Sequence, residues 1–156
     1  MSNPLIYKGD SEQTVSQLYS NDFTYLATIP GVTRLETVSA VDDNSEIVEL
    51  GVPIRWVQDT FTDRLLVTSN GIIRIDGCPV ESSECGEIAV ASADLDPATS
   101  GDVWFLDATA LDDTSISLDP NIIYIISWEN VSLYSFPSSR INAQALFYDN
   151  GTIEIC

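Results

Sequence analysis

The last third of the chain constrains the fold most. Residues 122–128 form a short apolar run rich in β-branched side chains, and a second such run extends over residues 140–148. Asn150-Gly151 separates the second run from residues 152–156, and an Asn-Gly pair between β-rich runs is the strongest short-range hairpin signal, because both central residues of the favoured tight turn need positive φ. This end is therefore predicted to form a central strand followed by a hairpin, with the upstream residues covering its two faces.

Upstream of this hairpin, short strand-like runs recur between turn residues. Strands are expected at residues 23–29, 34–41, 46–50, 54–57, 64–69, 72–76, 87–93 and 102–106. Pro53 is predicted to mark an edge or a bulge, because proline cannot donate to a central ladder, and Asn70-Gly71 to turn a second hairpin. No stretch after residue 20 keeps a helical period, so the pattern favours an all-β sandwich or barrel, and specifically an antiparallel β-sandwich.

The length of 156 residues fits a single domain with one core. Asp10 resembles a helix start, and Val15, Leu18 and Tyr19 fall on one helical face. Residues 1–21 are therefore expected to form an N-terminal extension or short helix, and residues 22–156 the β-sandwich domain.

The charge of the chain limits its partners. With 24 acidic and 6 basic residues its formal net charge is −18, which opposes binding to nucleic acid and to anionic membrane surfaces. The same charge suits solubility, cations and a saline medium. No run of 18 apolar residues is present, so direct membrane insertion is not expected.

Residue types also argue against catalysis. The chain has no histidine, which excludes Ser-His-Asp and Cys-His sites and most zinc sites. The segment Asp113-Thr114-Ser115 lacks the glycine and the second copy that an aspartic protease needs. Glu129 and Glu154 resemble a glycosidase pair only in residue type, and surface strand positions explain them better. We therefore predict a protein that is not an enzyme, with a hydrolase using Glu129 or Asp113 as the opposed alternative.

Three cysteines bear on compartment and length. Cys78 and Cys85 are expected to close a small disulfide loop, with buried thiols as the alternative. Cys156 is then expected either to form a disulfide with a cysteine outside this sequence or to remain a thiol. This suggests that the chain was excised from a longer protein.

Acidic loop residues are candidate ligands for Ca²⁺, a cation that takes 6 to 8 oxygen ligands. Asp94, Asp96 and Asp102 form the candidate metal set, together with Asp42 and Asp43 or with Asp112 and Asp113. No EF-hand spacing is present, so solvated loop carboxylates are the alternative explanation.

Two further features bear on surface chemistry. Asn130 and Asn150 each begin an N-glycosylation triplet, although the turn explains Asn150 equally well. Trp56, Trp104 and Trp128 lie within strand-like runs, where core packing is expected and a carbohydrate-stacking platform is the alternative.

Three segments in order carry a resemblance to a known family. They are residues 42–73 with Val67-Thr68-Ser69-Asn70-Gly71, residues 88–104 with Asp94-Leu95-Asp96-Pro97, and residues 126–155 with Asp149-Asn150-Gly151. Together they resemble nidogen-like (NIDO-related) β-sandwich domains over about three quarters of the chain.

The resemblance implies a module of extracellular adhesion, matrix or cell-surface proteins, with no catalytic residues. We accordingly predict a non-catalytic module for adhesion or for assembly of a surface structure, located outside the cell or on its surface. Its expected partners are other extracellular proteins, copies of itself, or glycans. The alternative function is a carbohydrate- or Ca²⁺-dependent ligand-binding module.

Overall fold

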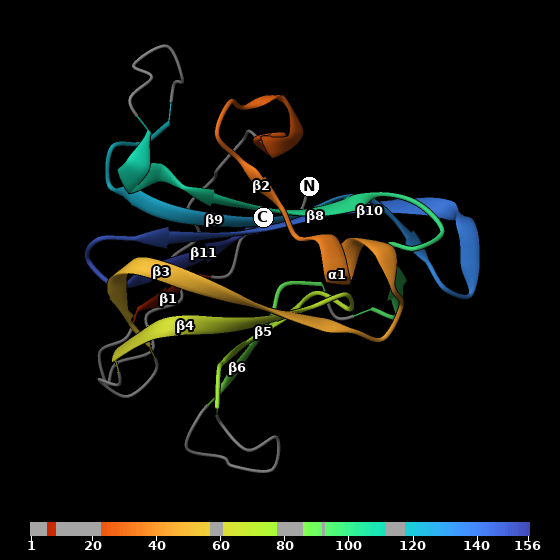
Figure 1. Ribbon diagram of the computed structural model, residues 1–156, viewed down its shortest axis with the longest axis horizontal. Coiled ribbons are helices and arrows are strands. Elements are labelled where there is room, and N and C mark those ends of the chain that lie inside the picture. The colour runs from red at the N-terminus through yellow and green to blue at the C-terminus, as the bar shows by residue number, and fades with distance from the viewer. Residues whose placement is uncertain (1–5, 9–22, 57–60, 78–85, 92, 112–117) are drawn as a thin grey trace.

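The computed structural model describes residues 6–8, 23–56, 61–77, 86–91, 93–111 and 118–156. For residues 6–8 it describes the backbone alone. Two antiparallel sheets lie one above the other, with a further layer of irregular segments on one of them (Figure 1). The prediction of an all-β antiparallel sandwich is therefore confirmed.

Among the described residues, the larger sheet, called sheet A, holds seven strands in the order β1-β11-β10-β9-β8-β2, with β7 paired to β9. Its strands are β1 (Ile6–Lys8), β2 (Thr33–Arg34), β7 (Leu95–Asp96), β8 (Asp102–Asp107), β9 (Ile122–Leu133), β10 (Phe136–Tyr148) and β11 (Thr152–Ile155). β9 pairs with β10 on one side and with β8 and β7 on the other, which confirms the predicted central strand. The strand that contains the predicted run over residues 140–148 is longer than expected, since β10 begins at Phe136.

The smaller sheet, called sheet B, runs in the order β3-β4-β5-β6. Its strands are β3 (Ser45–Arg55), β4 (Phe61–Thr68), β5 (Ile72–Ile75) and β6 (Glu87–Ala89). β3 is an edge strand whose register with β4 shifts between Glu49 and Ile54, so the irregularity predicted at Pro53 is confirmed. Its backbone is satisfied there from sheet A: the Tyr124 hydroxyl accepts from the Val52 amide at 2.7 Å and donates to the Val52 carbonyl at 2.9 Å.

Both Asn-Gly turns are present, but in a different form from the one predicted. Only the glycines have positive φ, 74° at Gly71 and 81° at Gly151, whereas neither Asn70 nor Asn150 does. Each turn is a three-residue loop whose glycine amide bonds back to the last residue of the preceding strand, at 3.4 Å to Thr68 and 3.0 Å to Tyr148. A glycine in the left-handed region closing such a loop is the common three-residue hairpin connection.

The main core lies between the two sheets. It contains the inward side chains of both, among them Trp56, Trp128, Leu65, Val67, Ile73, Tyr124, Ile126, Phe147 and Ile153. Trp128 also links the layers, because its indole N–H donates to the Thr68 carbonyl at 3.1 Å. Core packing is thus confirmed for Trp56 and Trp128, and a sugar platform made of all three tryptophans is wrong.

The strand predicted over residues 23–29 is instead an irregular segment with a 3₁₀ turn, η1 (Leu26–Thr28), lying over the outer face of sheet A (Figure 1). Leu26 and Ile29 pack there in a second apolar cluster with Leu106, Ile125, Leu146 and Ile122. A second 3₁₀ turn, η3 (Ala108–Ala110), follows β8. This segment is therefore held by packing of Leu26 on the face of sheet A, and not by the strand pairing that was predicted.

The strand predicted over residues 34–41 is also wrong, because residues Glu36–Ala40 form the short helix α1. Leu35 and Val38, three residues apart, both enter the main core. The Glu46 carboxylate accepts from the backbone amide of Thr37 at 2.7 Å, which satisfies a group that a helix leaves unpaired at its start. Tertiary contacts therefore override the strand-like composition here.

Candidate functional site

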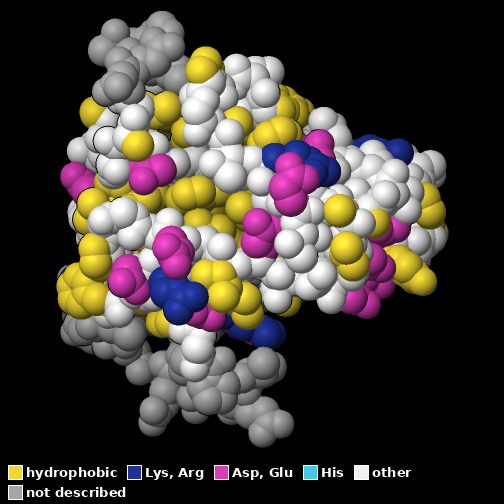
Figure 2. All heavy atoms as spheres, in the orientation of Figure 1, with side chains coloured by type: hydrophobic (Ala, Val, Ile, Leu, Met, Phe, Trp, Pro, Cys, Tyr) yellow, Lys and Arg dark blue, Asp and Glu magenta, His cyan; other side chains and the backbone are white. Residues whose placement is uncertain are grey.

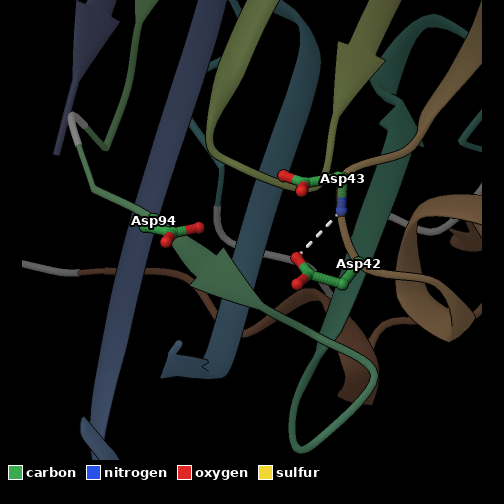
Figure 3. A group of neighbouring side chains, drawn as sticks. All are labelled: Asp42, Asp43 and Asp94. Atoms are coloured by element: carbon green, nitrogen blue, oxygen red, sulfur yellow. Dashed lines mark hydrogen bonds between the residues drawn. The ribbon is translucent and has the colours of Figure 1, made fainter. Parts of the chain in front are cut away.

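Three aspartates gather where two loops meet beside sheet B. Asp42 and Asp43 precede β3, Asp94 precedes β7, and one carboxylate oxygen from each lies within 4.8 Å of the others (Figure 3). Asn70 of the β4–β5 turn joins the two loops. Its amide nitrogen donates to Asp43 at 2.9 Å, and its oxygen accepts from the Leu95 amide at 2.8 Å.

The electrostatics of this group favour a cation. Burial raises the pKa of the Asp42 carboxyl, and the charges of Asp43, Asp96 and Asp94 raise it further, against a backbone hydrogen bond from Asp43 that lowers it. The ion pairs formed among the described side chains use other carboxylates. The three aspartates therefore repel one another without a neutralising side chain in the described part of the chain.

The structure brings together only part of the predicted metal set. Asp94 joins Asp42 and Asp43, but Asp96 instead accepts from the Thr99 amide at 3.2 Å. Asp102 forms an ion pair with the Arg34 Nε at 2.6 Å. The alternative ligands Asp112 and Asp113 lie outside the described residues.

An open hollow of about 290 Å³ adjoins the aspartates. It is lined by Asn70, Ile72, Glu87, Ala89, Ala91, Ala93 and Asp94. The space exists because alanine is the side chain at three alternate positions. Sequence reasoning missed this feature, although the alternation of alanines from residue 89 was visible.

The prediction that the two strand glutamates occupy surface positions is wrong. Glu129 and Glu154 are each only 4% exposed. Glu129 accepts from the Leu26 amide at 2.5 Å, and Glu154 accepts from the Tyr148 hydroxyl at 2.8 Å. Position 129 is buried because the Leu26 segment covers the outer face of β9. Both carboxylates are therefore buried and hydrogen-bonded within the fold, and neither faces an open cleft.

The remaining predicted positions have mixed outcomes. Cys78 and Cys85 lie outside the described residues, so their disulfide stays a prediction. Cys156 is half-buried, with its sulfur 3.7 Å from the Glu154 carboxylate. Both sequon asparagines, Asn130 and Asn150, are exposed.

No helix among the described residues has the length and apolar character needed to span a bilayer.

Comparison with known proteins assigns no role to these residues. Neither a protein-family model, nor a curated protein, nor a solved structure matches the chain. The resemblance to nidogen-like domains therefore stays a prediction, and the function has to be inferred from the contacts, charges and exposure of the described side chains.

Proposed function

We propose that this chain is a non-catalytic β-sandwich module, related to nidogen-like domains, that acts outside the cell in adhesion or in assembly of a surface structure. The observation that carries the proposal is the exposure of large aromatic side chains on a well-packed sandwich. Phe61 is 67% exposed, Phe136 66% and Tyr134 57%. Aromatic side chains of this kind are enriched where proteins contact one another.

These aromatic side chains lie at opposite ends of the sandwich. Tyr134 and Phe136 occupy the tip of the β9–β10 hairpin, and Phe61 begins β4 at the other end (Figure 1). A rigid body with contact groups at two ends is suited to act as a spacer between partners. On the face in Figure 2, acidic side chains are widespread and the basic ones in the foreground lie against them, which supports a surface that limits nonspecific association.

The proposed location is tested on the natural source. The medium is collected without protease, the intact cells are treated with trypsin, and the protein is followed in both with an antibody against the whole chain. We expect the protein in the medium, or removed from intact cells by trypsin. Protein that is digested only after the cells are lysed would contradict an extracellular role.

Glycosylation gives a second test, in the case of a eukaryotic source. Asn130 forms hydrogen bonds through its backbone: its amide donates to the Asn142 side chain at 2.8 Å, and its carbonyl accepts from the Ser100 hydroxyl at 3.3 Å. The Asn150 side chain, by contrast, accepts from the Thr152 amide at 2.9 Å. We expect secreted protein to carry a glycan at Asn130, seen as a mass loss on enzymatic deglycosylation.

In the matched controls, Asn130→Gln removes this mass change and Asn150→Gln preserves it. An unmodified Asn130 peptide from secreted eukaryotic protein would show that exposure of the triplet is not sufficient.

A second candidate function, Ca²⁺-dependent ligand binding, is favoured by the grouping of Asp42, Asp43 and Asp94 within 4.8 Å. Their carboxylates supply part of an oxygen shell that water can complete. Ca²⁺ at about 100 times its dissociation constant would stabilise the fold by about 2.7 kcal/mol. We expect the melting temperature to rise by roughly 5 to 10 °C on going from chelator to Ca²⁺.

The matched control is Asp94→Asn, which keeps the shape of the side chain and removes one of the three charges. It should abolish the shift. An equal melting temperature of the unaltered protein in chelator and in millimolar Ca²⁺ would exclude this candidate.

A further inference from the structure

The outer face of sheet B differs from that of sheet A in having no described element packed on it (Figure 1). Across this face runs an apolar strip. Ile47, which is 44% exposed, lies opposite the half-buried Leu66. Leu66 lies diagonally across from Ile72, which is opposite the exposed Ala89. Side chains at these positions share a face because alternate residues of a strand point the same way.

The strip ends in the hollow beside the aspartates. Ile72 and Ala89 belong both to the strip and to the lining of the 290 Å³ space, and Asp94 forms part of its rim. That volume is close to the roughly 300 Å³ at which small-ligand pockets begin. It is large enough for one branched apolar side chain with a charged neighbour.

The unpaired charge on this face is negative. Arg64 lies 2.9 Å from Asp76, and Arg74 lies 2.8 Å from Glu87, so both arginines are already paired. The aspartates at the rim have no such partner among the described side chains. An incoming group is therefore attracted if it is cationic and repelled if it is acidic.

We propose that the outer face of sheet B binds a segment of another protein in which apolar side chains alternate with Lys or Arg. One apolar side chain fills the hollow over Ala89, and a neighbouring cation approaches Asp94 and Asp43. The inference rests on the proposed role as a contact-making module and names the chemistry of its partner.

A second copy of this chain fits the face less well than a basic partner. Each copy carries a formal charge of −18 and only six basic residues, so two copies repel each other. Arg34, Arg64 and Arg74 are moreover held in ion pairs within the same chain. A basic segment from a different protein supplies the missing positive charge.

Binding of a labelled peptide tests the proposal on the full chain. The probe is fluorescein-labelled Lys-Leu-Lys-Ile-Lys-Leu, followed by fluorescence anisotropy, and the comparison probe is Lys-Ser-Lys-Ser-Lys-Ser, which has the same charge. We expect the first peptide to bind at least tenfold more tightly. Ala89→Phe fills the hollow without changing the charge and should weaken binding of the first peptide at least tenfold. Ala110→Phe is the matched control, because Ala110 is exposed in η3, which lies against β9 of sheet A, and this variant should leave binding unchanged.

Equal binding of the two peptides, or equal binding by Ala89→Phe and the unaltered chain, would overturn the proposal in favour of general attraction to an acidic surface. If Ala89→Phe lowers the melting temperature, Asp94→Asn decides instead, and unchanged binding by it counts against the proposal. Self-association that Ala89→Phe abolishes would also overturn the choice of partner. Failure of peptide binding by a protein that trypsin still reaches on intact cells leaves the proposed function standing.

Discussion

Replacing Gly101 with alanine is expected to lower the free energy of unfolding by about 3 to 5 kcal/mol, which combines left-handed backbone strain with overpacking. Gly101 has φ of 91° and immediately precedes β8. A Cβ atom there would lie 2.6 Å from the backbone carbon and oxygen of Asn130 and 2.6 Å from the carbonyl oxygen of Glu129. These are backbone atoms of the central strand, so they cannot rotate away.

Gly77→Ala is the matched control. Gly77 also has positive φ, 79°, but among the described residues no atom beyond its chain neighbours lies within 4 Å of its expected Cβ position. Only the backbone strain remains, so the cost should be about 1 kcal/mol. Denaturant unfolding followed by tryptophan fluorescence measures both variants. Equal losses would mean that the contact between Gly101 and β9 relaxes at little cost.

The strands whose two faces differ in polarity were predictable from the sequence. In β4, Leu65 and Val67 are fully buried, whereas Leu66 and Thr68 between and after them are only half-buried. Such alternation has a period of two, which only a strand provides. The hairpin glycines were predictable too, because their positive φ is a local property of the turn.

The layer over sheet A was not predicted, and the reason lies in β9. Residues Ile122–Trp128 are nearly all apolar rather than alternating, which is typical of a strand buried on both faces. The sequence therefore indicated a cover on each side of β9 but not which segment supplies it. Leu26 and Ile29 do so from about a hundred residues upstream, and their own β-like neighbours favoured the wrong element.

The aspartate group was predicted only in part for a similar reason. Asp94, Asp96 and Asp102 are close in sequence, but Asp96 accepts a hydrogen bond from Thr99 in the turn after β7. The pairing of β2 with β8 brings Asp102 to Arg34, with which it forms an ion pair. The residues that do meet Asp94 precede a strand of the other sheet. Their approach depends on the packing of the two sheets and on Asn70, which no local pattern contains.

Replacing Glu129 with alanine is expected to cost about 3 to 5 kcal/mol, because a buried acceptor is lost and the donors that it satisfied are left unpaired. Its carboxylate accepts from the amides of Leu26 at 2.5 Å and Ala27 at 3.4 Å and from the Ser127 hydroxyl at 3.1 Å. The loss should act first on the segment over sheet A. Hydrogen exchange at Leu26 and Ala27 should therefore accelerate more than exchange in β4 on the other sheet.

Glu36→Ala is the control, because the Glu36 side chain is 75% exposed and pairs with Arg34 at the surface. Exposed pairs contribute at most about 1 kcal/mol, so this variant should unfold near the midpoint of the unaltered protein. If Glu129→Ala were as stable as Glu36→Ala, the carboxylate would not hold the outer layer, and a chemical role for it would have to be reconsidered. A large loss of hydrogen-exchange protection confined to residues 23–32 would instead establish that Glu129 holds this segment against the outer face of sheet A.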